Sequence, residues 1–336
     1  MTPTSSTDAS RSATARGSGR NLTTERWARV GARLVSGASV LIGAATVAFL
    51  AQAALPGDRA TTILNIRAGQ AQLRTAAELA DINDQYGLER PLANQFLDYL
   101  ASMARGDLGV SYQQHRPVID VIGEQLGATV ALSLTAIALA WVLMVVWVTL
   151  TAGRGPRVRA IGTFADIVTA GLPSYWLGII LLLSLALGAG LFPVIGGTGP
   201  RGIVLPALTL AIPLAGFMGQ ATRAEFERSL EQPFVVSARM RGMSDLAVRL
   251  RHVLRHAVLP SVTLTGWALG ATLSGAVIVE SIFSRPGIGK VLVTAVNSQD
   301  LPIVVGVVVL VAAVYVVANL LVDLLYFVFD PRMRAA

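Results

Sequence analysis

The chain has 336 residues, of which 53% are hydrophobic and only 14% charged, and its formal net charge is +7. Soluble domains have about a quarter of their residues charged, so this composition excludes an ordinary soluble protein and indicates a membrane protein. The absence of cysteine excludes disulfides and thiolate metal sites, and the three histidines lack a metal-ligand spacing such as His-Glu-x-x-His.

The N-terminal region has low hydrophobicity. Residues 1–33 are rich in Ser, Thr, Ala, Gly and Arg and contain almost no large apolar side chain before Leu22. Such a composition cannot bury enough apolar surface to offset the entropy of ordering the chain. We therefore expect residues 1–33 to be a disordered cytoplasmic tail.

Six apolar runs follow, each long enough to cross a bilayer, which takes about 20 residues. The first run carries no charge and is longer than the apolar core of a cleavable signal, which has about 7–15 residues. The predicted fold class is therefore an all-α integral membrane protein with six transmembrane helices. The runs are Leu34–Leu55, Leu126–Gly153, Ile161–Phe192, Ile203–Thr222, Ser261–Phe283 and Leu301–Phe329.

The distribution of lysine and arginine predicts how these helices are oriented. Eighteen of the 27 basic residues lie in the tail, in the loops after the second and fourth runs, and at the C-terminal end. Because loops rich in Lys and Arg remain in the cytoplasm, we expect both termini to be cytoplasmic and 56–123 to be extracytoplasmic. Topology thus accounts for the positive charge, and we expect no nucleic-acid partner.

The predicted extracytoplasmic segment, 56–123, has a helical periodicity of its own. Apolar side chains recur at helical spacing over 79–103. Gly87 and Pro91 divide this stretch into two short predicted helices, and Gly106 ends the second. We expect these helices to lie flat over the outer mouth of the bundle, either as a gate or as an inert interfacial cap.

The loop between the fourth and fifth runs, 223–260, is too long for a tight turn and has a regular pattern. Pro233 can open a helix over Phe234–Met240, because its missing N–H falls among the unpaired donors of a first helical turn. Gly242 stands where a left-handed residue would end that helix. Ser244 is a good N-cap for a second helix, and Asp245 is favourable in its first turn.

The second helix of this loop is predicted to be amphipathic. Its apolar residues form one helical stripe, comprising Leu246, Leu250, Val253, Leu254, Ala257 and Val258. The other face carries Arg249, Arg251, His252, Arg255 and His256.

Three interpretations of this helical loop compete. An amphipathic helix on anionic lipid headgroups is one. A DNA-binding helix-turn-helix is another, but it is disfavoured because transmembrane helices tether both ends of the loop and keep it from reaching a DNA groove. The third is a rigid docking element that receives force from a cytoplasmic partner.

Three carboxylates lie within or near the apolar runs, where a charge is costly to bury and often functional. We predict that Asp166, near the start of the third run, is a solvated interfacial residue. Asp323, in the sixth run, is predicted to have a structural hydrogen-bond or arginine partner. Glu280, near the outer end of the fifth run, is the best candidate to line a path through the membrane, where it would attract a cationic group.

The stretch VVSARMRGMSDLAVRLRHVLRHAVLP, residues 235–260, resembles the EAA loop of permease subunits in binding-protein-dependent ABC importers. Ala238 matches an alanine of that signature and Gly242 its central glycine, whereas Val236 stands in place of its glutamate. The stretches YGLERPLANQFLDYL, RGDLGVSY, GLPSYWLGIILLL and GAVIVESIFSRPGIGKVLV are similar to the B-type subunit of the peptide/nickel subfamily. The resemblance runs from about Leu34 to Arg334.

This resemblance implies a core permease domain over 124–336, with a coupling loop at 223–260. It also implies that a knob within this loop docks on an ATPase. The knob comprises Ser237, Ala238, Arg239, Met240, Arg241, Gly242, Met243, Ser244 and Asp245.

The implied function is that of a translocation subunit and not an enzyme, in a bacterial cytoplasmic membrane. The chain has no GxxxxGK[ST] motif, so ATP and Mg²⁺ are expected in partner subunits, with no cofactor on this chain. The implied partners are a C-type permease, two ATP-binding subunits and an extracytoplasmic binding protein, surrounded by membrane lipids.

The substrate implied by the subfamily is a di- or oligopeptide, with Glu280 as the tentative residue of the substrate path. Nickel chelates, glutathione and other small solutes are alternatives, since similar subunits carry them. A self-sufficient secondary transporter is an alternative of another class, although no internal repeat or paired intramembrane charge favours it. A membrane enzyme is disfavoured, because no nucleophile–base or metal constellation is present.

Overall fold

The computed structural model describes residues 21–54, 57–194 and 199–329, with the side chains of 21–30, 34 and 321–329 left out. The described residues form helices and loops with no β-sheet, as the sequence predicts. Residues 1–20 of the predicted tail lie outside the described residues. Residues 21–33 differ from the prediction, because helix α1 (Asn21–Ala53) begins well before the apolar run.

Among the described residues, five helices are long and apolar enough to cross a membrane. Their spans coincide with five of the six predicted runs. In chain order these helices are α1, α5 (Val118–Thr151), α8 (Pro200–Leu230), α12 (Leu259–Ile282) and α14 (Leu301–Phe329).

The predicted third span is not one straight helix. Helix α6 (Pro156–Gly171) is followed by α7 (Ser174–Leu181) and the π-helical η1 (Leu182–Gly188), with a bend of 99° between the two parts. The bend falls at Leu172, whose extended conformation (φ −70°, ψ 124°) is the one that a following proline, Pro173, favours. An apolar run alone therefore predicted the length of this span but missed its break.

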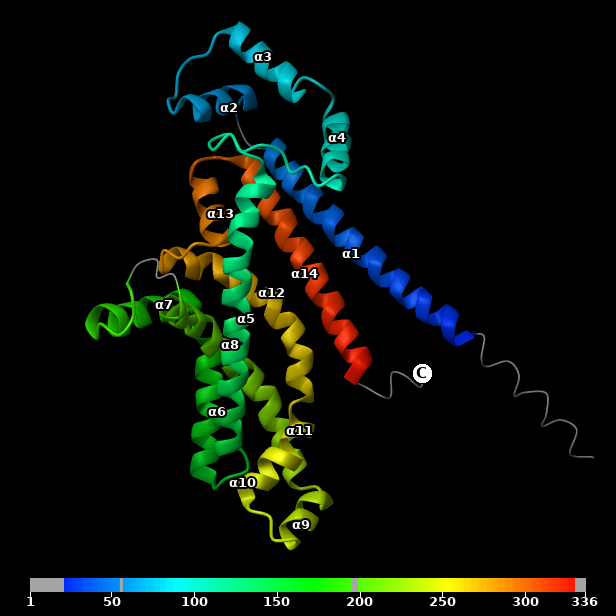
Figure 1. Ribbon diagram of the computed structural model, residues 1–336, viewed down its shortest axis with the longest axis vertical. Coiled ribbons are helices and arrows are strands. Elements are labelled where there is room, and N and C mark those ends of the chain that lie inside the picture. The colour runs from blue at the N-terminus through cyan, green and yellow to red at the C-terminus, as the bar shows by residue number, and fades with distance from the viewer. Residues whose placement is uncertain (1–20, 55–56, 195–198, 330–336) are drawn as a thin grey trace, which may run out of the picture.

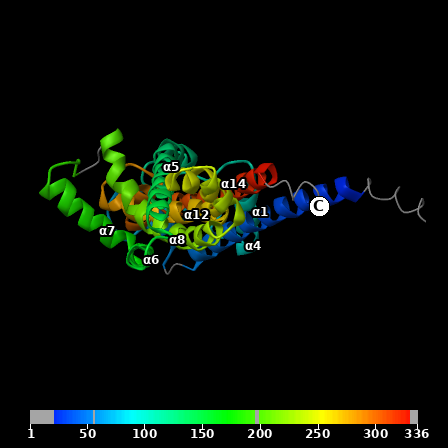
Figure 2. The same cartoon turned by 90° about the horizontal axis from the view of Figure 1, so that it is seen from below.

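Helix α5 runs along the bundle and packs against α8, α12, α13 (Ile288–Asn297) and α14 (Figure 1). Seen from below, α1 and the α6–α7 pair extend from opposite sides of this bundle (Figure 2). Near α8, Met144 and Val148 of α5 pack with Met218 and Phe226 of α8 in a buried cluster. The bundle is therefore held together by apolar burial along α5 and α8.

Three short helices lie at one end of the bundle, namely α2 (Arg59–Ala68), α3 (Ala76–Tyr86) and α4 (Leu92–Ala104) (Figure 1). Helices α3 and α4 are the two that the sequence predicts, and Gly87 separates them in the left-handed conformation. Helix α2 was missed, although Asp58 caps it by accepting a hydrogen bond from the Thr61 backbone N–H.

The remaining helices connect the spans. Helix α13 (Ile288–Asn297) lies between α12 and α14, at the same end as α2–α4. The opposite end carries α9 (Pro233–Met240), α10 (Asp245–Val248), the π-helical η2 (Arg249–Val253) and α11 (Leu254–Ala257). We call residues 233–257 the coupling segment, after the role that the sequence predicts for it.

Candidate functional site

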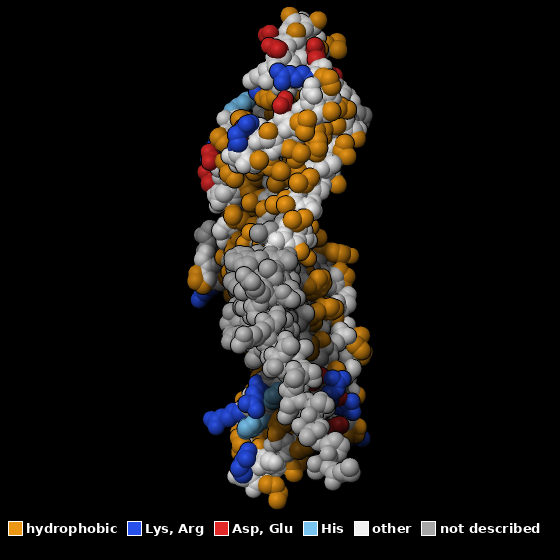
Figure 3. Space-filling view, turned by 90° about the vertical axis from the view of Figure 1, so that its right-hand side faces the viewer, with side chains coloured by type: hydrophobic (Ala, Val, Ile, Leu, Met, Phe, Trp, Pro, Cys, Tyr) orange, Lys and Arg blue, Asp and Glu red, His pale blue; other side chains and the backbone are white. Residues whose placement is uncertain are grey.

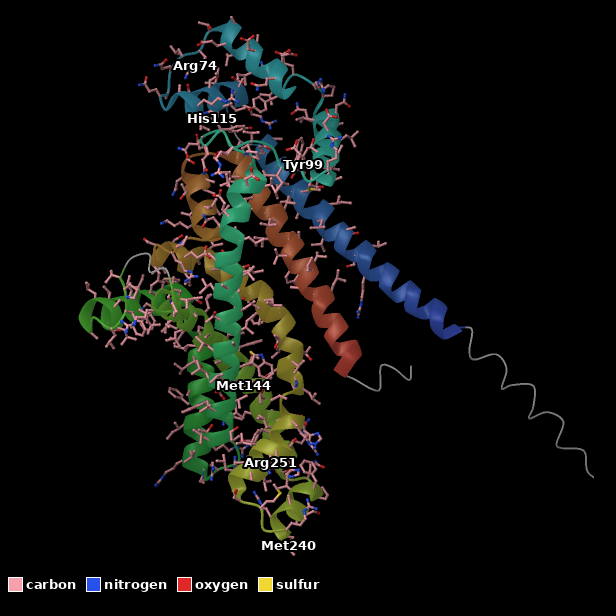
Figure 4. The ribbon with its side chains drawn as sticks, viewed as in Figure 1. Arg74, Tyr99, His115, Met144, Met240 and Arg251 are labelled. Atoms are coloured by element: carbon pink, nitrogen blue, oxygen red, sulfur yellow. The ribbon has the colours of Figure 1, made fainter. Side chains whose placement is uncertain are left out.

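The coupling segment forms the tip of the molecule at the end away from α2–α4, and Met240 lies at its extremity (Figure 4). Helix α9 begins at Pro233 and ends at Met240, within one residue of the predicted bounds. Gly242 follows with φ 77°, in the left-handed conformation that the sequence predicts. Its N–H donates to the Arg239 carbonyl at 2.9 Å, which closes the end of the helix.

The atoms around Gly242 do not require a residue without a side chain. No atom lies within 4 Å of where a Cβ on Gly242 would be, so the backbone conformation alone favours glycine there.

The second part of the segment begins at Ser244, as predicted. The Ser244 side chain accepts a hydrogen bond from the Ala247 backbone N–H at 3.4 Å. The next residue, Asp245, lies between three arginines, with oxygen–nitrogen distances of 2.8 Å to Arg249, 3.2 Å to Arg239 and 3.5 Å to Arg154. Asp245 therefore ties α9, η2 and the α5–α6 loop to one carboxylate.

These arginines also affect the acidity of Asp245. Burial by itself would raise the pKa of Asp245, but the hydrogen bonds and charges of Arg249, Arg154 and Arg239 outweigh it and lower the pKa below its usual value. The carboxylate is therefore ionised at neutral pH and can hold all three cations.

Arg249 fastens the coupling segment to the rest of the bundle. It is only 2% exposed, and its Nη1 donates to the carbonyls of Thr149 at 3.1 Å and Ala152 at 2.6 Å. These carbonyls lie at the C-terminal end of α5, where helical carbonyls lack partners and a cation is favoured. The guanidinium also lies 5.7 Å from the ring centre of Phe226 on α8.

The apolar stripe predicted over Leu246–Val258 is wrong in its first half. Leu246 and Leu250 are exposed, whereas Val248 and Arg249 are buried, and only from Val253 onward does the predicted face point inward. The reason is the π-helical geometry of η2, which takes more residues per turn than an α-helix and so shifts the face. Arg249 is buried in spite of its charge, because the end of α5 supplies acceptors.

The knob has an apolar and basic outer surface. Its tip exposes Met240 to 85%, and Val236 is exposed beside it. Basic side chains gather at this end of the molecule (Figure 3), and Arg239 and Arg241 of the knob are exposed. On the inner side, Val235 and Ala238 are fully buried in the cluster around Phe226. An exposed apolar patch rimmed by charge on a rigid base is typical of a protein-binding surface.

The nine predicted knob residues thus lie together, with different exposures. Ala238 is buried, and Met243 and Asp245 are partly buried. The exposed members are Ser237, Arg239, Met240, Arg241, Gly242 and Ser244.

The prediction for Asp166 is wrong. Asp166 is buried, and its carboxylate accepts a hydrogen bond from Arg223 Nε of α8 at 2.6 Å. The sequence placed Arg223 in the loop, but α8 continues well past the predicted end of the fourth span and carries Arg223 inside the protein. The third carboxylate, Asp323, has a side chain outside the described residues.

Glu280 lies on α12 at the end near α13 and is 0% exposed. Its carboxylate accepts hydrogen bonds from Thr129 Oγ1 at 2.6 Å, and from the backbone N–H groups of Gly289 at 2.8 Å and Lys290 at 3.4 Å. A Cβ at Gly287 would collide with this carboxylate. Glu280 thus closes the corner between α12 and α13, and its contact with a transported solute stays a prediction.

The described part of the chain has no group of three or more His, Asp or Glu side chains that could hold a metal ion.

Comparison with known proteins gives a consistent result. Residues 144–335 match the family model described as binding-protein-dependent transport system inner membrane component. The chain is 31% identical over 303 residues to the glutathione transport system permease protein GsiC of Salmonella choleraesuis (strain SC-B67) and to that of Escherichia coli (strain K12). Each match covers 90% of this chain and 97% of the relative.

Among solved structures, the crystal structure of an amino acid ABC transporter with histidines matches with a TM-score of 0.45 and 18% identity. This match covers 70% of this chain and 98% of that chain.

Proposed function

Because this chain belongs to the family of binding-protein-dependent inner-membrane permeases, we propose that it forms one half of the translocation path of an importer for small peptides. The family assignment makes the chain a multi-pass inner-membrane subunit and not an enzyme. It also removes the alternative of a self-sufficient secondary transporter.

The cargo that we favour is glutathione or a solute of similar size, ahead of di- and oligopeptides in general. The observation that supports this choice is the 31% identity to permeases named for glutathione transport, over 97% of their length. Nickel chelates remain the second candidate class, from the subfamily resemblance. In either case an extracytoplasmic binding protein would deliver the cargo to the end that carries α2–α4 and α13.

We propose that the partners are a related permease subunit and two ATP-binding subunits. The exposed Met240 and Val236 at the tip of the coupling segment would dock in a groove of an ATP-binding subunit. Because Val235 and Ala238 pack beneath them and Arg249 fastens the segment to α5, a push on the tip would reach the bundle. ATP and the loaded binding protein would then bias the inward-open and outward-open states by their differential affinity.

The cargo is tested with the whole complex reconstituted in liposomes. We expect ATP-dependent uptake of labelled glutathione with the cognate binding protein present, and at least about tenfold less uptake of a nickel–histidine chelate, a difference that corresponds to about 1.4 kcal/mol. Preferential uptake of the chelate would move the assignment to the second candidate. A complex that takes up none of these solutes with ATP would contradict the proposal as a whole.

The coupling role is tested with Gly242→Pro. Proline fixes φ near −65° and has no N–H, so it can neither adopt φ 77° nor donate to Arg239. We expect the variant complex to be inserted and to hydrolyse ATP, but with uptake uncoupled from hydrolysis. Transport at the normal rate would show that the coupling role is wrong.

A matched control for this variant lies at the other end of the molecule. Gly106 has φ 80°, has no atom within 4 Å of its Cβ position, and donates its N–H to the Met103 carbonyl at 2.9 Å. Gly106→Pro makes the same local change away from the coupling segment, so we expect it to leave the number of ATP molecules hydrolysed per solute unchanged.

A further inference from the structure

A buried ion pair joins α6 to α8 in the half of the bundle nearest the coupling segment. Asp166 Oδ2 and Arg223 Nε are 2.6 Å apart, and the side chains are only 3% and 6% exposed. Neither residue belongs to the knob. The pair therefore needs an explanation of its own.

The helices approach closely around this pair. A Cβ at Gly219 would lie 2.9 Å from Asp166 Oδ1, and a Cβ at Gly162 would lie 2.7 Å from both Arg223 Nη1 and Thr151 Oγ1. Glycine at these positions lets α5, α6 and α8 meet with the two charged groups between them. The close approach of the three helices therefore fits this arrangement of Asp166 and Arg223.

Stability alone does not explain why the pair is present. Arg223 Nη1 and Nη2 are buried and make no hydrogen bond to any described residue, so the guanidinium uses only its Nε. Burying two charges costs several kcal/mol each, which such a pair repays only with good geometry and further hydrogen bonds. Apolar side chains of similar volume would stabilise the fold about as well, whereas a charged pair selects one relative position of two helices.

The two helices lead to two different parts of the protein, the coupling segment and the bent α7–η1 region. Helix α8 ends at Leu230, and α9 of the coupling segment starts at Pro233. Helix α6 ends at the 99° bend, beyond which α7 and η1 extend to the side of the bundle. A rigid link between α6 and α8 would therefore carry a displacement of the coupling segment to α7.

We propose that Asp166 and Arg223 form a positioning pair, which locks α6 to α8 so that the coupling segment and the bent α6–α7 span move as one body. This inference rests on the proposed function, since it assigns a role in coupling ATP hydrolysis to transport. The pair contacts neither cargo nor ATP, and it acts through the helices that it joins.

The chain offers a matched control on the same two helices. Arg159 of α6 and Glu227 of α8 form a second ion pair, but Arg159 is 61% exposed and Glu227 18%. Exposed pairs contribute about 0–1 kcal/mol and do not hold one geometry tightly. Glu227→Gln therefore removes an α6–α8 ion pair without removing the buried link.

The test variant is Asp166→Leu with Arg223→Met in the reconstituted complex. Because the pair is replaced by apolar groups, we expect the thermal unfolding midpoint to be kept or raised. We expect the ATP hydrolysed per imported solute to rise about tenfold, within the range that coupling residues produce. Glu227→Gln should leave that ratio unchanged.

The outcomes separate this inference from the proposed function. A double variant that folds and imports with the wild-type ratio overturns the positioning role and leaves the function intact. A wild-type complex without ATP-dependent uptake overturns the function on which the inference rests. Should the double variant not insert, Asp166→Asn with Arg223→Gln replaces the charges by amides, and normal coupling in that variant also overturns the positioning role.

Discussion

Each end of the bundle buries a charged side chain against the end of a helix, and two such side chains, Arg249 and Glu280, have opposite sign. Arg249 donates to carbonyls at the C-terminal end of α5, whereas Glu280 accepts from N–H groups at the N-terminal end of α13. Both arrangements match the helix dipole, which favours cations at the C-terminal end and anions at the N-terminal end.

The surroundings of the two side chains differ. Glu280 is 0% exposed and faces Thr129 and the backbone of α13, so its corner is closed on all sides. Arg249 fastens a segment whose outer side exposes Met240, Val236 and several arginines. The same match of charge and helix dipole therefore stabilises an internal corner at one end and the base of the proposed docking surface at the other.

The largest effect is expected at the closed corner. Glu280→Ala removes the acceptor of three donors, two of them buried and one partly buried, and we expect the free energy of unfolding to fall by about 3–5 kcal/mol. Glu280→Gln keeps one acceptor oxygen and should cost clearly less. Thermal unfolding of the purified complex measures both losses of stability. Equal, small losses would show that Glu280 does not stabilise the corner between α12 and α13.

The same Gln variant also tests the predicted contact with cargo. If Glu280→Gln leaves the uptake of every cationic solute unchanged, Glu280 does not attract the cargo.

A smaller loss is expected at the fastened end. Arg249→Met removes the donor to the Thr149 and Ala152 carbonyls and one of the three arginine partners of Asp245, which should cost about 2–3 kcal/mol. Because the docking surface then loses its anchor, hydrolysis should also become less dependent on the cargo-loaded binding protein. Arg251→Met, an exposed change two residues on, should have an effect within about 0.5 kcal/mol. Equal losses of stability in the two variants would show that Arg249 does not fasten the coupling segment.

Two glycines of positive φ, one at each end of the molecule, allow a third test of the comparison. Gly242→Ala and Gly106→Ala each place a Cβ at positive φ in open space, and each should cost about 1 kcal/mol. Native-state hydrogen exchange of the adjoining helix ends measures the local loss. Gly127→Ala, in a regular turn of α5 with open space around it, should be neutral or slightly stabilising. A loss at Gly127 as large as at Gly242 would refute the conformational argument.

The smallest effect is expected from pH. Since the pKa of Asp245 is lower in the folded protein than in the unfolded chain, its contribution to stability is complete above the unfolded value of about 4 and is lost as the pH falls through the lowered pKa. The unfolding midpoint of the wild type should therefore approach that of Asp245→Asn below about pH 4. A constant difference between the two proteins down to pH 3 would contradict this assignment.

Much of the coupling segment was predictable because its signals are local. Pro233 opens α9, Gly242 ends it and Ser244 caps the next helix, and each acts through its own backbone conformation or a neighbouring N–H. The outer helices α3 and α4 follow from Gly87 and Pro91 in the same way. Such signals depend only on residues that are close together in the sequence, so they can be recognised without the tertiary structure.

The amino-acid sequence by itself determined the all-helical membrane fold, five of the six spans as continuous helices and the local structure of the knob, because hydrophobic length, turns and caps act over a few residues. Only the tertiary structure decided where Asp166, Arg249 and Glu280 lie. Each finds its partner on another helix or at another helix end, Arg223 for Asp166, the end of α5 for Arg249 and the start of α13 for Glu280. A buried charge is tolerated where such a partner is present, and no periodicity in the chain shows which helices will meet.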